Sequence, residues 1–277
     1  EDCAKQCDAG EALSCAFAGT IYERGTGVKP NPQTAFKYYQ QACKAGNLDG
    51  CTGQAMLYSK GTGVPRDDKR ADQMLNDACT KGNGRACSGL GQRLRLKGDI
   101  KPALPLFNRA CSFGYARACF YYGSFGVKAG MPESVARKSF ERACLGRDLR
   151  GCLGAATFAS SGDNAAKQQG ATFLDMGLKG LERACTASDG EACNVLGDYH
   201  SGQYDPAQKD PTKAKDYYDS ACKAGQTDAC KSGGGPVGKP PGKGPGKAPP
   251  PPPPPGPKPM KQGPPGPPPP PPPRSKP

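Results

Sequence analysis

The chain has 277 residues and a formal net charge of +13, but its composition changes near residue 230. Residues 231–277 hold 23 of the 31 prolines, ten of the 39 glycines and eight Lys or Arg, with no Asp or Glu. The other 30 basic and 25 acidic residues leave residues 1–230 with a charge of only +5. Nucleic-acid-binding folds concentrate Lys and Arg on one element, so this distribution argues against a nucleic-acid partner. The chain contains no run of 18 apolar residues, which argues against a membrane span.

Fifteen cysteines accompany a single histidine. Most of the cysteines are separated by seven-residue spacers, which are poor metal clips, so a disulfide framework is favoured over a metal site or free thiols. Disulfides predict an oxidising compartment, either the bacterial periplasm, cell surface or extracellular space, or the mitochondrial intermembrane space. The sequence begins at Glu1 without an apolar leader, and we expect that a signal peptide has been removed. No metal or cofactor is expected.

Fourteen of the cysteines form seven pairs of identical spacing. The pairs are Cys7 and Cys15, Cys43 and Cys51, Cys79 and Cys87, Cys111 and Cys119, Cys144 and Cys152, Cys185 and Cys193, and Cys222 and Cys230. Successive first cysteines are 36, 36, 32, 33, 41 and 37 residues apart, and a period of this size indicates a repeat array. Cys3 lies outside the pairs, and the sequence leaves open whether it bridges to another chain, pairs with a removed residue or stays inert.

Each period accommodates two amphipathic helices. In the first copy, one helix ends at the glycine turn of residues 25–27. A second helix, capped by Thr34, carries an apolar stripe through residues 35–43 and ends at Gly46. Later copies drift, and the fifth contains a polar insertion at residues 162–170. In all six second helices an alanine precedes the cysteine, which predicts close helix packing at that position.

The repeated unit resembles the Sel1-like repeat, an αα-hairpin relative of the tetratricopeptide repeat. The pattern Leu-Gly-x-x-Tyr-x-x-Gly-x-Gly-Val, followed by Ala-x-x-Tyr/Trp-x-x-Ala-Ala-x-x-Gly, is matched by residues 22–28 and 35–46, and partly by 58–64 and 196–197. A cysteine in place of the second alanine, with another cysteine eight residues on, is similar to the cysteine-rich secreted subfamily that includes the Helicobacter cysteine-rich proteins. The resemblance covers about residues 3–230 and weakens in repeats three to five.

This resemblance implies an all-α fold, a right-handed solenoid of about six αα-hairpin repeats over residues 1–230. It also implies one disulfide within each Cys-x7-Cys unit. Closing a nine-residue loop stabilises each step by about 2.6 kcal/mol in the chain-entropy model. Residues 231–277 form a second region, which composition predicts to be disordered or locally polyproline II.

Some members of the subfamily are described as penicillin-binding proteins or weak β-lactamases, so serine motifs bear on the function. The chain contains Ser220-Ala221-Cys222-Lys223, Ser188-Asp189-Gly190 and Lys60-Gly61-Thr62-Gly63. A serine acylase needs its Ser-x-x-Lys at a helix start beside a Lys-Thr-Gly strand, whereas these residues have places in the repeat pattern. No catalytic residue is therefore assigned, and β-lactam binding or hydrolysis stays an alternative that rests on the resemblance alone.

Two kinds of aromatic position have a possible binding role. His200, expected to be exposed, is the only histidine and assembles no metal cluster. The tyrosine pairs 38–39, 121–122 and 217–218 either line a concave peptide groove or, as the pattern favours, place one ring in the core and one at the surface.

The proline-rich region adds little specificity. Pro269, Pro272 and Arg274 fit a Pro-x-x-Pro-x-Arg ligand motif, but a semi-rigid basic spacer is favoured. Its charge favours loose contact with anionic envelope polymers or lipid headgroups. The leading hypothesis is a secreted or periplasmic scaffold that binds a protein or peptide on its concave surface. A structural envelope protein tethered by this region is a further alternative.

Overall fold

The computed structural model describes residues 2–159 and 163–232, which are helical throughout apart from their connections. The elements are α1 (Asp2–Asp8), α2 (Ala12–Arg24), α3 (Pro32–Lys44), α4 (Leu48–Lys60), α5 (Asp68–Thr80), α6 (Gly84–Leu96), α7 (Ile100–Ser112), α8 (Ala116–Lys128), α9 (Glu133–Leu145), α10 (Leu149–Ala159), α11 (Asn164–Thr186), α12 (Gly190–His200), the 3-10 helix η1 (Pro206–Gln208), α13 (Pro211–Lys223) and α14 (Ala229–Ser232). The ligand motif at Pro269, Pro272 and Arg274 lies outside the described residues, and the boundary at residue 230 stays a prediction.

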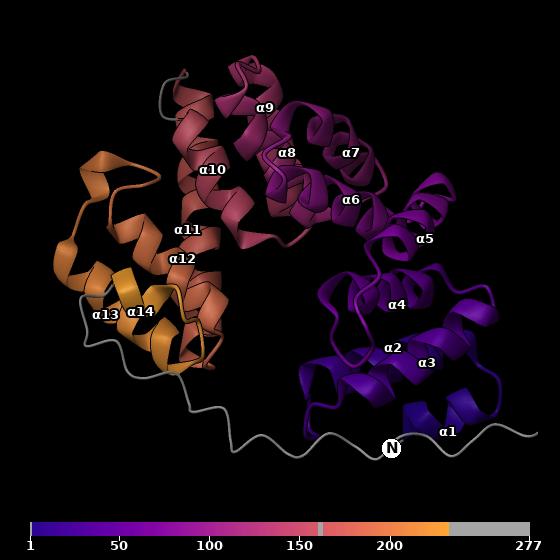
Figure 1. Ribbon diagram of the computed structural model, residues 1–277. Coiled ribbons are helices and arrows are strands. Elements are labelled where there is room, and N and C mark those ends of the chain that lie inside the picture. Colours follow the sequence, from indigo (N-terminus) through magenta and orange to yellow (C-terminus); the bar gives the residue numbers. More distant parts are fainter. Residues whose placement is uncertain (1, 160–162, 233–277) are drawn as a thin grey trace, which may run out of the picture. The chain divides into compact units, whose positions relative to one another are not determined.

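Consecutive helices pack against one another along the chain (Figure 1). Each even-numbered helix from α2 to α8 also contacts the next even-numbered helix, so α2, α4, α6, α8 and α10 form one layer of the array. The odd-numbered helices from α3 to α13 are the second helices of the pairs. The predicted all-α repeat solenoid is confirmed.

A disulfide joins each second helix to the next helix along the chain, and a further one joins α1 to α2. Seven such bridges are present, each between cysteines eight residues apart, with Cα–Cα distances of 4.4 to 4.8 Å. In the second unit, Cys43 lies in the last turn of α3 and Cys51 in the first turn of α4, as the sequence predicts. The expectation of one disulfide per repeat is confirmed, and each bridge fastens one helix turn to the next.

Small residues bring these turns together. Ala42 and Ala143, each directly before a bridged cysteine, are fully buried. A Cβ built on Gly50 would lie 2.3 Å from the Cβ of Ala42, and one on Gly151 would lie 2.4 Å from that of Ala143. The predicted close packing at the alanine before the cysteine is therefore confirmed at these steps.

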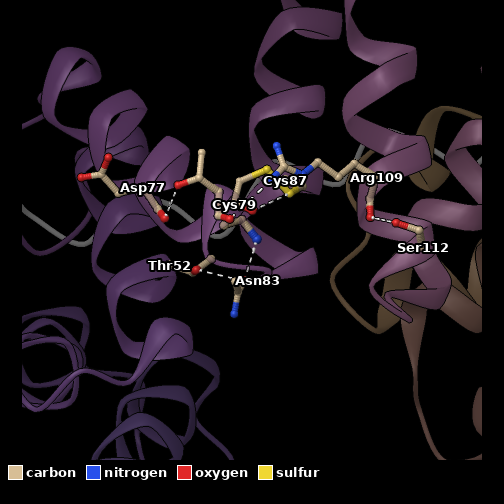
Figure 2. The surroundings of a disulfide bond; sticks show 9 residues. Thr52, Asp77, Cys79, Asn83, Cys87, Arg109 and Ser112 are labelled. Carbon is tan, nitrogen blue, oxygen red and sulfur yellow. Dashed lines mark hydrogen bonds between the residues drawn. A yellow bond between two sulfur atoms is a disulfide. The ribbon is translucent and has the colours of Figure 1, made fainter.

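Asparagine caps support the bridged turns. At the Cys79–Cys87 bridge, Asn83 Oδ1 accepts a hydrogen bond from the backbone N–H of Ala86 at 2.8 Å (Figure 2). The Thr52 hydroxyl of the preceding repeat lies 3.2 Å from the same oxygen. The cap thus satisfies an otherwise unpaired helix N–H and links neighbouring repeats at the same time.

The predicted cap of α3 is wrong by three residues. Asn31, not Thr34, is the N-cap, and its Oδ1 accepts a hydrogen bond from the backbone N–H of Thr34 at 3.0 Å. Pro32 then occupies the first helical position, where its missing N–H costs no intrahelical bond. In the sequence, an asparagine followed directly by a proline indicates this N-cap, and the same arrangement recurs at Asp210 and Pro211.

The polar insertion of the fifth copy lengthens a helix. Residues 164–170 belong to α11, which is 23 residues long, and Asp163 caps it by accepting from the Ala166 N–H at 2.8 Å. The other second helices from α3 to α13 have 13 residues. The extra turns therefore lie at the N-terminal end of α11, before the residues that follow the repeat pattern, and the spacing within that pattern is unchanged.

Most second helices end with a glycine in the left-handed region, as Gly46 does at φ 83°. Its N–H donates to the Cys43 carbonyl while the next N–H donates to Ala42, which satisfies the last carbonyls of α3. Two copies depart from this pattern. Arg147 and Ser188 have φ values of 67° and 66° in the equivalent turns, where a side chain is strained.

We expect Ser188→Gly to raise the free energy of unfolding by about 0.5–1 kcal/mol. The change removes a left-handed strain of about 1–2 kcal/mol, against the greater backbone entropy that glycine loses on folding. The urea midpoint of the purified protein measures the effect. The reverse change at an equivalent turn, Gly46→Ser, is the control and should destabilise; a destabilising Ser188→Gly would contradict the strain argument.

Candidate functional site

A hollow of the described residues lies among α8, α10 and α12. Its volume is about 590 Å³, within the range of ligand pockets. Each of the three helices presents side chains at spacings of three or four, the spacing of one helix face. The lining side chains include Phe120, Tyr121, Ser124, Phe125 and Lys128 from α8, Arg150, Thr157 and Phe158 from α10, and Glu191, Asn194, Val195 and Asp198 from α12. Because the three helices belong to successive repeats, the hollow exists only through stacking.

Five aromatic rings form a continuous row along one wall. The centroid distances are 5.8 Å from Phe125 to Tyr121, 5.9 Å from Tyr121 to Phe120, 5.9 Å from Phe120 to Phe140 and 5.7 Å from Phe140 to Phe158. These distances are those of favourable aromatic pairs. We call these five residues the aromatic row.

Glycine at two points lets the row pack closely. A Cβ on Gly154 would lie 2.7 Å from the ring of Phe140, and one on Gly123 would lie 2.9 Å from it. Phe140, from the second helix α9, is therefore held between the backbones of α8 and α10. The row is fixed by the packing of the fold.

Arg150 lies where the charged and aromatic walls meet. Its Nε donates to Asp148 Oδ1 at 2.9 Å and its Nη1 to Glu191 Oε1 at 3.1 Å. The guanidinium carbon lies 4.7 Å from the centroid of Phe120 and 5.5 Å from that of Tyr121. Burial lowers the pKa of Arg150, but the hydrogen bonds and charge of Asp148 outweigh it, so the net pKa is raised. Arg150 is a permanent cation that orders this wall.

A second hollow adjoins the first. Its volume is about 490 Å³, and the two share Arg150, Glu191 and Val195 in their linings. In the second hollow, Arg117 Nη2 donates to Glu191 Oε2 at 3.2 Å, which connects α8 to α12 across a separation of 74 residues. The strained Arg147 also lines it. Because the two hollows share these lining residues, we refer to them together as the groove.

Asp198 and Tyr204 also line the first hollow. Asp198 accepts hydrogen bonds from the Tyr218 hydroxyl at 2.9 Å and from Gln203 Nε2 at 3.2 Å. Burial raises the pKa of Asp198, and the Tyr218 bond offsets only part of this. Burial, with the nearby Asp198 charge, also raises the pKa of Tyr204. Asp198 is thus a carboxylate in an unfavourable environment for charge.

The serine motifs are not assembled into a site. Ser220 is exposed on α13, and its hydroxyl donates to the carbonyl of Asp216 at 2.9 Å. Ser188 is exposed in the turn before α12, and Lys60 is the last residue of α4. These residues belong to different repeats, and each has the local role that the repeat pattern predicts.

The other singled-out residues have mixed outcomes. His200 is half-buried, not exposed as predicted, because its ring stacks on Tyr217 at 5.4 Å. Burial lowers its pKa, so it is neutral near pH 7.

The tyrosine pairs follow the predicted division between core and surface at two of three places. Tyr39 and Tyr218 are buried while their preceding tyrosines are half-buried, but in the 121–122 pair both rings are half-buried and Tyr121 lines the hollow. Cys3 is a half-buried free thiol in α1.

Residues 2–159 and 163–232 contain no group of three or more His, Cys, Asp or Glu side chains able to hold a metal ion. None of the helices in these ranges combines the length and the apolar character needed to cross a bilayer.

Sequence reasoning missed Arg150, Glu191 and Asp198. A signal was present in the aligned copies, because the position two residues before the second cysteine varies in charge. It is Asp49, Arg85, Arg117, Arg150 and Glu191 in successive units. A position within the apolar core of each repeat would not carry such varied charges, so the alignment identifies a face of the repeats that lies outside that core.

The family model for the Sel1 repeat matches residues 12–47, 51–83 and 190–226. The unmatched central stretch includes α8 and α10, two of the three helices that line the groove. No curated protein matches the chain. The groove therefore lies largely where the repeats depart from the family pattern.

Solved structures share the fold. A Sel1 repeat protein from Oxalobacter formigenes has a TM-score of 0.52 and 22% identity, with 78% of this chain and 89% of that chain covered. The antigen c5321 of uropathogenic Escherichia coli, described as displaying an SLR fold, has a TM-score of 0.52 and 19% identity, with 83% of this chain and 50% of that chain covered. The described part of this chain is thus an all-α helical repeat solenoid of the Sel1 type, and it contains Sel1 repeats at the three matched stretches.

Proposed function

We propose that this protein is a secreted or periplasmic scaffold of the cysteine-rich Sel1 subfamily that binds an extended segment of a protein partner in the groove of α8, α10 and α12. The observation that carries the proposal is that two adjoining hollows share Arg150, Glu191 and Val195 in their linings. The linings present aromatic and arginine side chains, which are favoured at interface hot spots.

The disulfides support the compartment. Seven bridges within about 230 residues are typical of proteins in an oxidising extracytoplasmic environment. They also hold neighbouring helix turns together, so the groove is preformed. Less binding free energy is then lost in ordering the groove when a partner binds.

The test is selection of peptides from a displayed random library against the intact disulfide-bonded protein, followed by fluorescence titration of the selected peptides. Ser124→Arg fills the groove from α8 without removing one of its ring or ion-pair contacts, and it should weaken binding about tenfold or more. Ser112→Arg, at the exposed end of α7, is the matched control and should leave the affinity unchanged. Peptides that bind both variants equally well would refute the proposed groove.

A further inference from the structure

The wall that carries Asp198 lacks a cation of its own. Asp198 Oδ1 accepts from Tyr218 and Gln203, and Asn194 Nδ2 lies 3.4 Å from Oδ2, so the partners are a phenol and two amides. Among the ion pairs within residues 2–159 and 163–232, none includes Asp198. A partly buried carboxylate without a countercharge is costly unless something binds it.

The remaining charges around the hollow do not compensate Asp198. Arg150 is the buried cation, and it is already matched by Asp148 at 2.9 Å and by Glu191 at 3.1 Å. Lys128 lies exposed at the end of α8, where solvent and salt screen its charge. Arg117 also pairs with Glu191, at 3.2 Å, so the two arginines balance Asp148 and Glu191, and the charge of Asp198 is left unmatched.

The aromatic row supplies the second half of a cation site. Ring faces attract cations through their quadrupoles, and the row already holds two, because the guanidinium carbon of Arg150 lies 4.7 Å from the centroid of Phe120 and that of Arg95 lies 5.4 Å from the centroid of Phe125. Beyond Phe120 the row also includes Phe140 and Phe158. A cation in the hollow would have both aromatic rings and the Asp198 carboxylate among the groups that line it.

We propose that this hollow binds a lysine or arginine side chain of the partner segment, with its ammonium or guanidinium group between the aromatic row and the carboxylate of Asp198. The inference rests on the proposed function, since it specifies the side chain that the groove selects. The volume of about 590 Å³ accommodates a long side chain together with adjoining backbone. The raised pKa of Asp198, caused by burial, agrees with a carboxylate that awaits a countercharge.

The direct test measures the binding of small probe molecules to the full chain by NMR titration. Nα-acetyl-lysine methylamide and its arginine analogue should bind at least about fivefold more tightly than the neutral norleucine analogue. A free amine, n-butylamine, should bind more weakly than the lysine amide if the natural source is a protein side chain. Equal binding of the norleucine and lysine probes, preference for an acetyl-glutamate probe, or no binding of any probe would overturn the inference. Tighter binding of n-butylamine would overturn the assignment to a partner's side chain.

Asp198→Asn tests the carboxylate itself. The asparagine Oδ1 retains the bonds from Tyr218 and Gln203, and only the long 3.4 Å bond from Asn194 Nδ2 to Oδ2 is lost, so the fold is expected to be preserved and the preference for lysine over norleucine should disappear. Removal of a buried charge should also leave the thermal midpoint equal or higher, which a purely structural role for Asp198 would not produce. Asp216→Asn changes the net charge equally at an exposed position of α13 and should leave the preference intact. Equal effects of the two substitutions would refute a local site.

The library selection separates this inference from the proposed function. Peptides that lose affinity with Ser124→Arg but show no enrichment in lysine or arginine would overturn the cation site and leave the groove. If the lysine probe binds through Asp198 while no peptide responds to Ser124→Arg, the peptide-binding function is refuted and the cation site stands.

Discussion

Replacing Arg150 with methionine is expected to lower the free energy of unfolding by about 3–5 kcal/mol. The side chains of Arg150 and Asp148 are only 13% and 8% exposed, so the substitution leaves a carboxylate buried without its cation. Methionine retains much of the apolar contact with Phe120, so the decrease in the free energy of unfolding is caused mainly by the loss of the positive charge. Urea unfolding monitored by far-UV circular dichroism, with all disulfides intact, measures the change.

Two further variants make this result specific. Arg117→Met removes the other cation on Glu191, but both side chains of that pair are 46% exposed, so the cost should not exceed about 1 kcal/mol. Combining Arg150→Met with Asp148→Leu removes both charges of the buried pair and should recover much of the lost stability. Equal losses for Arg117→Met and Arg150→Met, or no recovery in the double variant, would show that the buried ion pair is not the cause.

The sequence was sufficient to predict the repeat frame because that frame is local. Each helix pair is specified within one period by its glycine turn, its apolar stripe and the two cysteines that close the step. The wrong prediction of Thr34 as the N-cap of α3 is also a local error, because the actual N-cap, Asn31, lies only three residues away and is of a residue type that caps helices equally well. The lengthened α11 was not foreseen because polar residues such as those at 164–170 have no apolar stripe of their own.

The groove could not be predicted in the same way, because its contacts join repeats. Arg150 reaches Glu191 over 41 residues, and Arg117 reaches the same carboxylate over 74. Such pairs depend on how three hairpins stack, which no single period encodes. The half-buried state of His200 has a similar origin, since Tyr217 from the following helix covers its ring.

The family pattern also concealed the groove. Conformity to a repeat consensus identifies residues that build the solenoid, and α8 and α10 lie in the stretch that the Sel1 model does not match. The residues that distinguish one solenoid from another occupy positions the consensus leaves free. For this chain, those positions carry aromatic rings and charges in place of the small and apolar residues that hold the array together.

Removing the Cys79–Cys87 bridge by substituting both cysteines with alanine is expected to lower the free energy of unfolding by about 3 kcal/mol or more. The chain-entropy contribution of the nine-residue loop is about 2.6 kcal/mol. Both cysteines are also buried, at 1% and 0% exposed, so deletion of their sulfur atoms adds a packing loss. Urea midpoints without reductant, on protein whose six other bridges are verified by peptide mapping, measure the effect.

The Cys222–Cys230 bridge provides a matched comparison. Its separation of eight residues is the same, so the chain-entropy model alone predicts an equal loss. In a solenoid each repeat contacts only its neighbours, and this last bridge fastens α14, a helix of four residues. Its removal should therefore fray the end of the array and cost less than the internal bridge. Cys3→Ser, at the free thiol, should change the midpoint by less than about 0.5 kcal/mol. Equal losses for the two bridges would mean that the unfolded chain alone sets their contribution, whereas the expected inequality shows that each disulfide acts through the repeats on both sides of it.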